Sequence, residues 1–336
     1  MKKNFFALML VCLIMWSCKK ESSKDTTDTG GKNSHKVTFT VGFSKQTTDF
    51  QTNGLKVNSA NRPLTTQALA DQVEVILFAI YNNKGDKVKV IQQSSTDAAF
   101  GTFAEELPDG SYTVIVAAGK TGLALSNDLG EDGSYYVAKS SLTTDILTYG
   151  TSPERIYPTI FDKEAFYKKV PLTIPGNAPQ TVYLNRITTE IQVIVKDAIP
   201  PNAKFFGLAI EQVAYKFYVS CGCSASITDS RLLGLYRSLD ISPTDIGTLN
   251  YTFSQPFLAL PKSNVTLYCS SEDLGSNSDS WSGDISTVLI PNVTCLPNQR
   301  TILTGNLFGG GGNPVNNGFH AVADTSWNGT PITKPF

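Results

Sequence analysis

Histidine is scarce in this chain of 336 residues: His35 and His320 are the only two, and neither lies in a Gly-x-Ser-x-Gly elbow or a Cys/His pairing. Catalysis by a nucleophile that a His base activates therefore has little support, and we expect no enzymatic activity. Charge of one sign is not in excess either, because 28 Lys and Arg stand against 29 Asp and Glu, for a net charge of -1. Nucleic-acid binders carry a basic surface, so we expect no nucleic-acid partner.

Motifs for metals and cofactors are also missing. Residues 127–133 suggest a calcium loop, but counting from Asp128 the third position is Gly130 and the twelfth is Lys139, where oxygen ligands are required. The glycines at 309–312 lack the Lys-Ser/Thr pair of a phosphate-binding loop. We therefore expect no cofactor and no resident metal ion.

The longest apolar run of the chain lies at the N-terminus. Residues 5–16 carry no charge and follow Lys2 and Lys3. A twelve-residue helix is about 18 Å long, too short for a hydrocarbon layer of about 30 Å. The run is therefore typical of a signal segment rather than of a membrane span.

Cys18 stands directly behind this run, between Ser17 and the polar segment that begins Lys-Lys-Glu. This arrangement resembles the lipoprotein signals of Bacteroidota, in which such a Cys is acylated and becomes the new N-terminus. The resemblance implies a signal peptide over 1–17, a lipid on Cys18, and attachment to the outer membrane, facing the cell surface. Residues 18–34 then form a tether, since residues 19–34 have no apolar side chain to bury. An ordinary secretory signal with Cys18 incidental is the alternative.

Alternation of apolar and polar residues dominates the rest of the chain, with no long run at helical spacing. Residues 35–44 form the first predicted strand, with one apolar face made by Val37, Phe39, Val41 and Phe43. Residues 72–81 are almost continuously apolar, which favours a strand covered on both faces, and the turn at 82–86 leads to a returning strand at 87–92. Pro108-Asp109-Gly110 predicts a second hairpin, between 100–107 and 111–118.

Residues 175–179, Pro-Gly-Asn-Ala-Pro, are the best linker in the chain, and we place a domain boundary there. The two expected domains cover 35–175 and 180–336. The second opens with a regular alternation at 187–195, and its further predicted strands lie at 205–210, 213–220, 249–253, 265–270, 288–290, 300–307 and 318–323. Many short strands with turns between them predict an all-β protein with two sandwich domains.

Five segments carry a family resemblance. They are 73–78 (Val-Glu-Val-Ile-Leu-Phe), 107–112, 184–191 (Leu-Asn-Arg-Ile-Thr-Thr-Glu-Ile), 300–308 and 324–328. Together with the lipoprotein signal they resemble the fimbrillin superfamily. The resemblance implies two transthyretin-like β-sandwich domains, in a subunit of type V fimbriae of Bacteroidota or in the lipoprotein that anchors such a fibre. Its partners would be other fimbrial subunits, joined by β-strand addition at an open edge.

In polymerising members of that superfamily an Arg-specific protease removes an N-terminal strand. The early candidate here, Arg62, is followed by Pro63, before which trypsin-like enzymes cleave poorly. We therefore favour an anchor or accessory subunit over a stalk subunit. A surface glycan-binding lipoprotein of a polysaccharide uptake system is a further alternative, with Tyr135, Tyr136, Trp281 and Trp327 as a stacking platform, and a host receptor also stays open.

Four cysteines follow Cys18. Cys221, Cys223, Cys269 and Cys295 form an even set in an exported chain, so two disulfides are plausible. Cys221 and Cys223 lack the Cys-x-x-Cys spacing of a zinc or thioredoxin-like site. We expect one of them to bridge to Cys269 or Cys295; buried free thiols are the alternative.

Overall fold

Strands make up almost all of the regular structure in the computed structural model, which confirms the predicted all-β class. It describes residues 33–43, 66–127, 140–149, 161–176, 180–214, 216–224, 233–272, 283–309, 319–324 and 332–334. The chain falls into two units, Met1–Asn33 and Ser34–Phe336, and all described strands belong to the second. Within the described ranges no helix has the length and apolar character that crossing a membrane requires.

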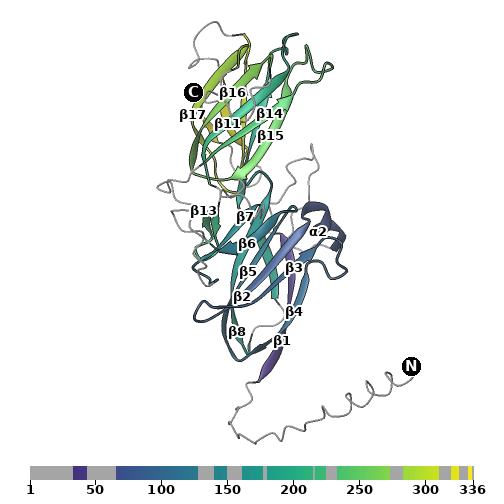
Figure 1. Ribbon diagram of the computed structural model, residues 1–336, viewed down its shortest axis with the longest axis vertical. Coiled ribbons are helices and arrows are strands. Elements are labelled where there is room, and N and C mark those ends of the chain that lie inside the picture. Colours follow the sequence, from purple (N-terminus) through teal and green to yellow (C-terminus); the bar gives the residue numbers. More distant parts are fainter. Residues whose placement is uncertain are drawn as a thin grey trace, which may run out of the picture. The chain divides into compact units, whose positions relative to one another are not determined.

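The first sheet has seven strands in the order β3-β2-β5-β8-β9-β1-β4 (Figure 1). Their bounds are β1 (Ser34–Phe43), β2 (Val75–Asn82), β3 (Lys87–Ser94), β4 (Thr102–Pro108), β5 (Gly110–Gly119), β8 (Ala165–Ile174) and β9 (Gln180–Arg186). β8 and β9 share only two residue pairs, at one end. The sheet therefore divides there into two layers, β3-β2-β5-β8 and β9-β1-β4, which face each other.

One apolar core fills the space between these layers. Val37, Phe39, Val41 and Phe43 of β1 are all buried, which confirms the predicted face of this strand. The ring of Phe103 on β4 stacks on Phe39 and lies 4.9 Å from the ring of Phe78 on β2, across the sandwich. Each such buried aromatic side chain contributes about 1.5–3 kcal/mol of transfer free energy. The short helix α2 (Thr66–Gln72) adds Leu69 to the same core.

β2 is buried on both faces, as its apolar run predicts. Its second face packs on a small sheet with the order β13-β12-β7-β6. The strands of this sheet are β6 (Leu123–Asn127), β7 (Asp145–Tyr149), β12 (Phe217–Tyr218) and β13 (Cys223–Ser224). Leu77 and Ala79 of β2 share a core there with Leu147 and Phe217. β12 comes from far along the chain, so this sheet joins segments that are distant in sequence.

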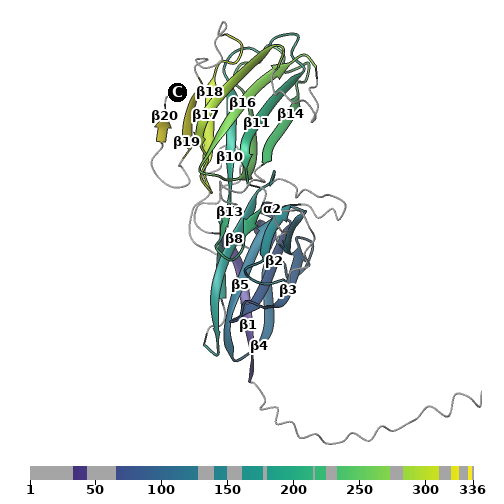
Figure 2. The same cartoon turned by 60° about the vertical axis from the view of Figure 1, so that its left-hand side comes forward.

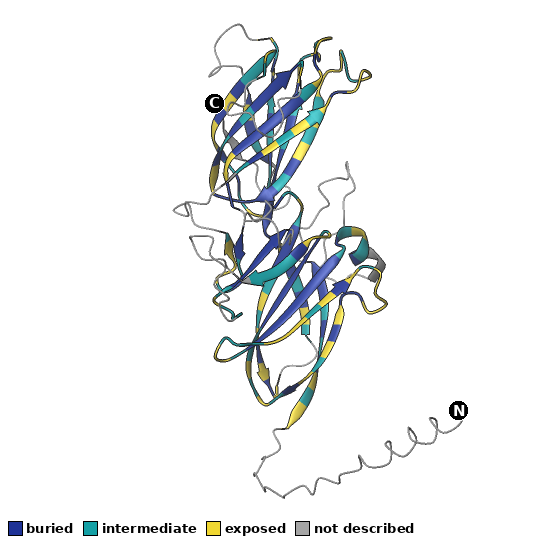
Figure 3. Ribbon diagram, in the orientation of Figure 1, coloured by how far each residue is buried: buried dark blue, intermediate teal, exposed yellow. Residues whose placement is uncertain are grey.

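The remaining strands form a second sandwich of a five-stranded sheet, β15-β10-β18-β19-β20, and a four-stranded sheet, β14-β11-β16-β17 (Figure 2). Their bounds are β10 (Thr188–Val195), β11 (Phe205–Val213), β14 (Leu233–Asp240), β15 (Tyr251–Leu258), β16 (Lys262–Ser270), β17 (Ser286–Thr294), β18 (Arg300–Gly305), β19 (His320–Asp324) and β20 (Ile332–Lys334). Both sheets contribute to one core, for example Ile191 and Val193 of β10 with Phe206 and Leu208 of β11. Buried residues follow the inner strands of both sandwiches (Figure 3).

The predicted hairpin around Pro108-Asp109-Gly110 is wrong. β4 pairs with β1, and β5 pairs with β2 and β8, so the strands on either side of the turn are not neighbours. Phe103 and Leu107 belong to one layer of the sandwich, whereas Val114 belongs to the facing layer. The turn therefore connects two facing layers whose apolar side chains share one core.

The predicted strand over 213–220 is interrupted. β11 ends at Val213, and the chain then crosses to pair Phe217 and Tyr218 with Leu147 and Ile146 of β7. The domain boundary at 175–180 stays a prediction. In the pairing pattern β9 still lies in the first sheet, beside β1, and the change to the next sheet falls at Ile187.

A buried acid makes the stability of this structure depend on pH. Glu190 on β10 is fully buried, and Arg300 donates to its Oε1 at 2.9 Å from the adjacent β18. Burial outweighs the guanidinium and raises the pKa of Glu190 to about 7, above its usual value of 4.5. The folded state therefore binds the proton more tightly than the unfolded state, and the free energy of unfolding falls as pH rises from about 4.5 to 7.

We expect Glu190→Gln to remove most of this slope. Urea unfolding at pH 5 and at pH 7.5 measures the free energy of unfolding of both proteins. From the lower to the higher pH, the wild type should lose up to about 3 kcal/mol more of this free energy than the variant does. Equal slopes in both proteins would show that Glu190 is ionised throughout this range.

Candidate functional site: an open strand edge

β3 is an edge strand of the first sandwich. Among the described strands it pairs with β2 alone, so one side of its backbone has no strand partner there. Unpaired N–H and C=O groups along such an edge are a template for a strand from another chain. The geometry of its side chains decides whether the edge repels or accepts that strand.

The lysines of β3 do not present uncompensated charge. Lysines on an edge strand normally discourage pairing with a foreign strand. Here the ammonium of Lys87 lies 2.8 Å from Asp145 Oδ2 on β7, and that of Lys89 lies 3.4 Å from Glu105 Oε1 on β4. Val88 and Val90, between and beside them, are 48% and 43% exposed. The edge therefore offers apolar side chains between lysines whose charge is balanced.

Asp145 fixes the beginning of β3. This carboxylate is fully buried, and besides Lys87 it accepts hydrogen bonds from Tyr81 Oη at 2.5 Å and from Ser140 Oγ at 2.7 Å. Burial, reinforced by the charge of Asp145, raises the pKa of Tyr81 well above its usual value. The phenol therefore stays protonated and donates to the carboxylate. Three partners compensate the cost of burying this charge.

Gln93 fixes the other end of β3, where the strand approaches β4. Its amide nitrogen donates to the carbonyls of Thr102 at 2.7 Å and Ala99 at 3.2 Å, and its amide oxygen accepts from the backbone N–H of Gly101 at 3.0 Å. At this end of β3, the Gln93 side chain thus makes the hydrogen bonds that a neighbouring strand would otherwise make. The open part of the edge lies between Gln93 and Lys87.

A second opening lies on the opposite side of this sandwich, between β8 and β9. Only Phe166 with Arg186 and Tyr167 with Asn185 are paired, and the two strands separate beyond them. Val182 and Leu184 of β9 are buried in the sandwich core, and none of the exposed large apolar side chains among the described residues belongs to β8 or β9. For that reason we take the β3 edge, with its exposed valines, as the candidate interface.

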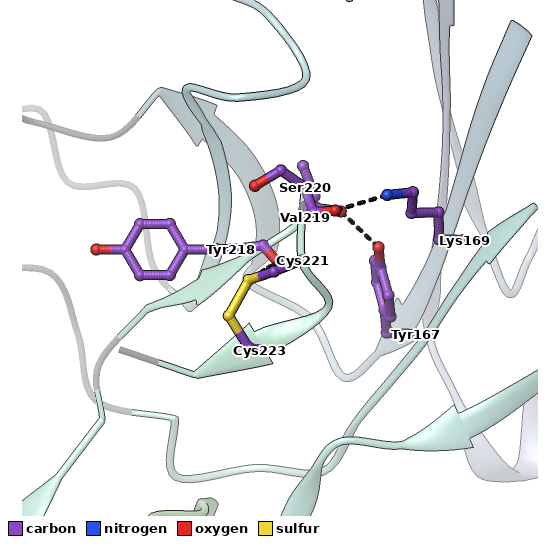
Figure 4. The surroundings of a disulfide bond; sticks show 7 residues. All are labelled: Tyr167, Lys169, Tyr218, Val219, Ser220, Cys221 and Cys223. Carbon is purple, nitrogen blue, oxygen red and sulfur yellow. Dashed lines mark hydrogen bonds between the residues drawn. A yellow bond between two sulfur atoms is a disulfide. The ribbon is translucent and has the colours of Figure 1, made fainter. Parts of the chain in front are cut away.

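The structure pairs the cysteines differently from the expectation. Cys221 and Cys223 form a disulfide with each other, with a Cα–Cα distance of 5.3 Å, in the turn between β12 and β13 (Figure 4). Cys269 and Cys295 are buried free thiols, and burial raises the pKa of each to about 12. A bridge between the two sets is prevented because Cys269 and Cys295 lie in the core of the second sandwich, whereas β12 and β13 extend the sheet of β7.

Several residues singled out in the sequence lie outside the described ranges. These are Cys18, Arg62, the acidic loop at 128–139, and the aromatic residues Tyr135, Tyr136, Trp281 and Trp327. Within the described ranges, no cluster of three or more His, Cys, Asp or Glu side chains is arranged to hold a metal ion. Sequence reasoning identified 87–92 as a strand but missed its edge position and the role of Asp145, for which the sequence holds no local signal.

Comparisons with known proteins identify the family of this chain. No curated protein matches it. Among solved structures it is similar to the fimbrial anchor protein Mfa2 from Porphyromonas gingivalis, with 13% identity, a TM-score of 0.44, and coverage of 89% of this chain and 99% of that one. It is also similar to a fimbrial assembly protein from Parabacteroides distasonis, with 11% identity, a TM-score of 0.43, and coverage of 90% and 99%.

The assignment rests on the family model, since identities and TM-scores at this level carry no functional argument. The model described as "Fimbrillin-A associated anchor proteins Mfa1 and Mfa2" matches residues 39–223, which is more than half of the chain and includes the second half of β1, all of β3 and the disulfide turn. The protein therefore belongs to the family of fimbrillin-A associated anchor proteins Mfa1 and Mfa2.

Proposed function

We propose that this protein is an outer-membrane lipoprotein, held by Cys18 and facing the cell exterior, that serves as an anchor or accessory subunit of a fimbrial fibre. It joins the fibre by accepting a strand of a neighbouring subunit at the edge of β3. Membership of the anchor family supports the fimbrial role. The observation that carries strand addition is the open β3 edge, with balanced lysines and exposed Val88 and Val90.

Affinity and specificity at this interface between the β3 edge and an incoming strand have separate sources. Backbone hydrogen bonds along the edge give affinity to any extended segment, whereas alternate side chains select the partner. Val88 and Val90 favour apolar residues on the incoming strand. Lys87 and Lys89 keep their present carboxylate partners, so the joint does not have to desolvate a lone ammonium group.

The lipid-bearing segment leads directly into the first sandwich. Residues 18–34 are 17 residues long, and a flexible chain of that length has an average end-to-end distance of about 23 Å. β1 begins at Ser34, at the end of this tether. We propose that the tether spaces two sandwich domains from the membrane, with several acyl chains on Cys18 as the anchor.

Replacing Cys18 by Ala tests this anchor. We expect the wild type in the membrane fraction, with an N-terminus at acylated Cys18 by mass spectrometry and with access to protease added to intact cells. The variant should leave the membrane fraction, because it lacks the thiol that would carry the acyl chains. An unchanged distribution of the variant would contradict the lipid anchor. A mature N-terminus near residue 63 in assembled fibres would identify a stalk subunit instead.

A further inference from the structure

A cavity of about 800 Å³ lies beside the turn that carries the Cys221–Cys223 disulfide. Its walls include the apolar side chains of Phe217 and Leu260, both buried, and the turn itself forms part of the lining. The charged residues that line it are Lys168, Lys169 and Arg186, with no carboxylate among them. A cavity of this size accommodates a small molecule or a few residues of a peptide.

The disulfide is accessible to such a ligand. Cys221, Gly222 and Cys223 are all exposed, in contrast to the buried thiols of Cys269 and Cys295. A cross-link between residues two positions apart closes a very short loop, and it therefore restrains the unfolded chain less than a bridge across a long loop would. The Cys221–Cys223 disulfide therefore contributes little to the stability of the fold. Accessible disulfides of this kind are the ones that undergo exchange with thiols.

The turn is held by contacts that do not depend on the disulfide. Tyr167 Oη donates to the carbonyl of Val219 at 2.6 Å, and Lys169 Nζ donates to the carbonyl of Ser220 at 2.7 Å. Figure 4 shows both side chains reaching the turn from β8. Gly222 takes a φ of +68°, a left-handed conformation that glycine adopts readily, and its N–H donates to the carbonyl of Tyr218 at 2.9 Å. Opening the sulfur–sulfur bond therefore leaves the turn in place.

We propose that the Cys221–Cys223 disulfide is a thiol-exchange site that captures a thiol-bearing ligand in this cavity. The thiolate of the ligand attacks the sulfur of Cys221 or Cys223, a new disulfide to the ligand forms, and the bond between the two cysteines breaks. The displaced sulfur leaves as a thiolate and takes up the proton that the ligand lost, so the exchange involves no net oxidation. The lysines beside the cavity favour both thiolates, since nearby cations lower the pKa of a thiol. This site is independent of strand addition at β3.

The experiment uses the intact chain purified from membranes, with two thiol probes in separate arms. One is glutathione, and the other is the apolar peptide acetyl-Leu-Phe-Cys-Leu-amide. After incubation, N-ethylmaleimide blocks the released thiol, and mass spectrometry examines the tryptic peptide 217–231. We expect a mass shift of one probe plus one maleimide on this peptide, and none on the peptides of Cys269 and Cys295. Faster reaction of the peptide identifies a partner chain as the source of the thiol, and faster reaction of glutathione identifies a small metabolite.

Two variants complete the test. Cys221→Ser with Cys223→Ser should form no adduct. Lys168→Gln should react about three- to tenfold more slowly, because it removes a cation that lines the cavity and keeps the contact of Lys169 with the Ser220 carbonyl. Adducts that form only after unfolding in urea, or that form at the buried cysteines at the same rate, would overturn the proposal.

Discussion

Replacing both Val88 and Val90 by Asp should release the fibre from the cell while leaving this protein folded. Each valine still has about half of its surface to bury, worth about 1 kcal/mol, and an Asp in the joint would add the cost of a desolvated charge. A loss of 2 kcal/mol or more weakens binding by about thirtyfold or more. The ratio of cell-bound to released fibre in the culture measures this loss.

Two matched controls separate the β3 edge from exposed apolar surface in general. Leu249 is 60% exposed but lies in a loop, so Leu249→Asp should leave the fibre attached. Leu289 is 43% exposed on β17, which is also an edge strand of its sheet. Release by Leu289→Asp but not by the β3 variant would place the joint on the second sandwich. Fibre that stays attached in all variants would exclude strand addition at either edge.

Replacing Asp145 by Ala should lower the free energy of unfolding by about 3 kcal/mol. The substitution leaves the ammonium of Lys87, which is 20% exposed, and the hydroxyl of Tyr81 without their buried acceptor. Removing one member of a buried ion pair costs about 3–5 kcal/mol, and the partial exposure of Lys87 places the effect at the lower end. The midpoint of urea unfolding, with the slope checked for change, measures it.

Asp109→Asn provides the control for this substitution. Asp109 is 44% exposed and lies 2.9 Å from His35, so its loss should change stability by less than about 1 kcal/mol. An unchanged midpoint for Asp145→Ala would mean that water replaces the carboxylate at Lys87. Asp145→Ala removes the carboxylate that balances the charge of Lys87 on the β3 edge. We therefore also expect this variant to weaken the attachment of the fibre.

The strands that the sequence predicted well are those whose pattern is local. β1 shows its buried face in four alternating residues, and β2 shows burial on both faces in an unbroken apolar run. The turn at 82–86 joins β2 to β3 as predicted, because its residues and the two strands are contiguous. In each case the alternation of side chains along a strand is enough to identify the face that meets the core.

Prediction from the sequence failed where the local residues do not indicate which distant strand or cysteine a segment pairs with. Asp109-Gly110 has the composition of a hairpin turn, yet β4 and β5 lie in facing layers. The cysteines gave no information on pairing, and the structure joins the nearest two. The candidate site was hidden for the same reason, since Lys87 and Asp145 are 58 positions apart and each is unremarkable in its own segment.

The sequence by itself determined the all-β class and the faces of individual strands such as β1 and β2, because composition and two-residue periodicity act within a few positions of the chain. The signal segment with Cys18 stays a prediction from the sequence. Only the tertiary structure decided which strand lies at an edge, which acid balances each lysine of β3, and which cysteines meet. These depend on how layers pack over a shared core, and the free energy of that packing is distributed over residues far apart in the sequence.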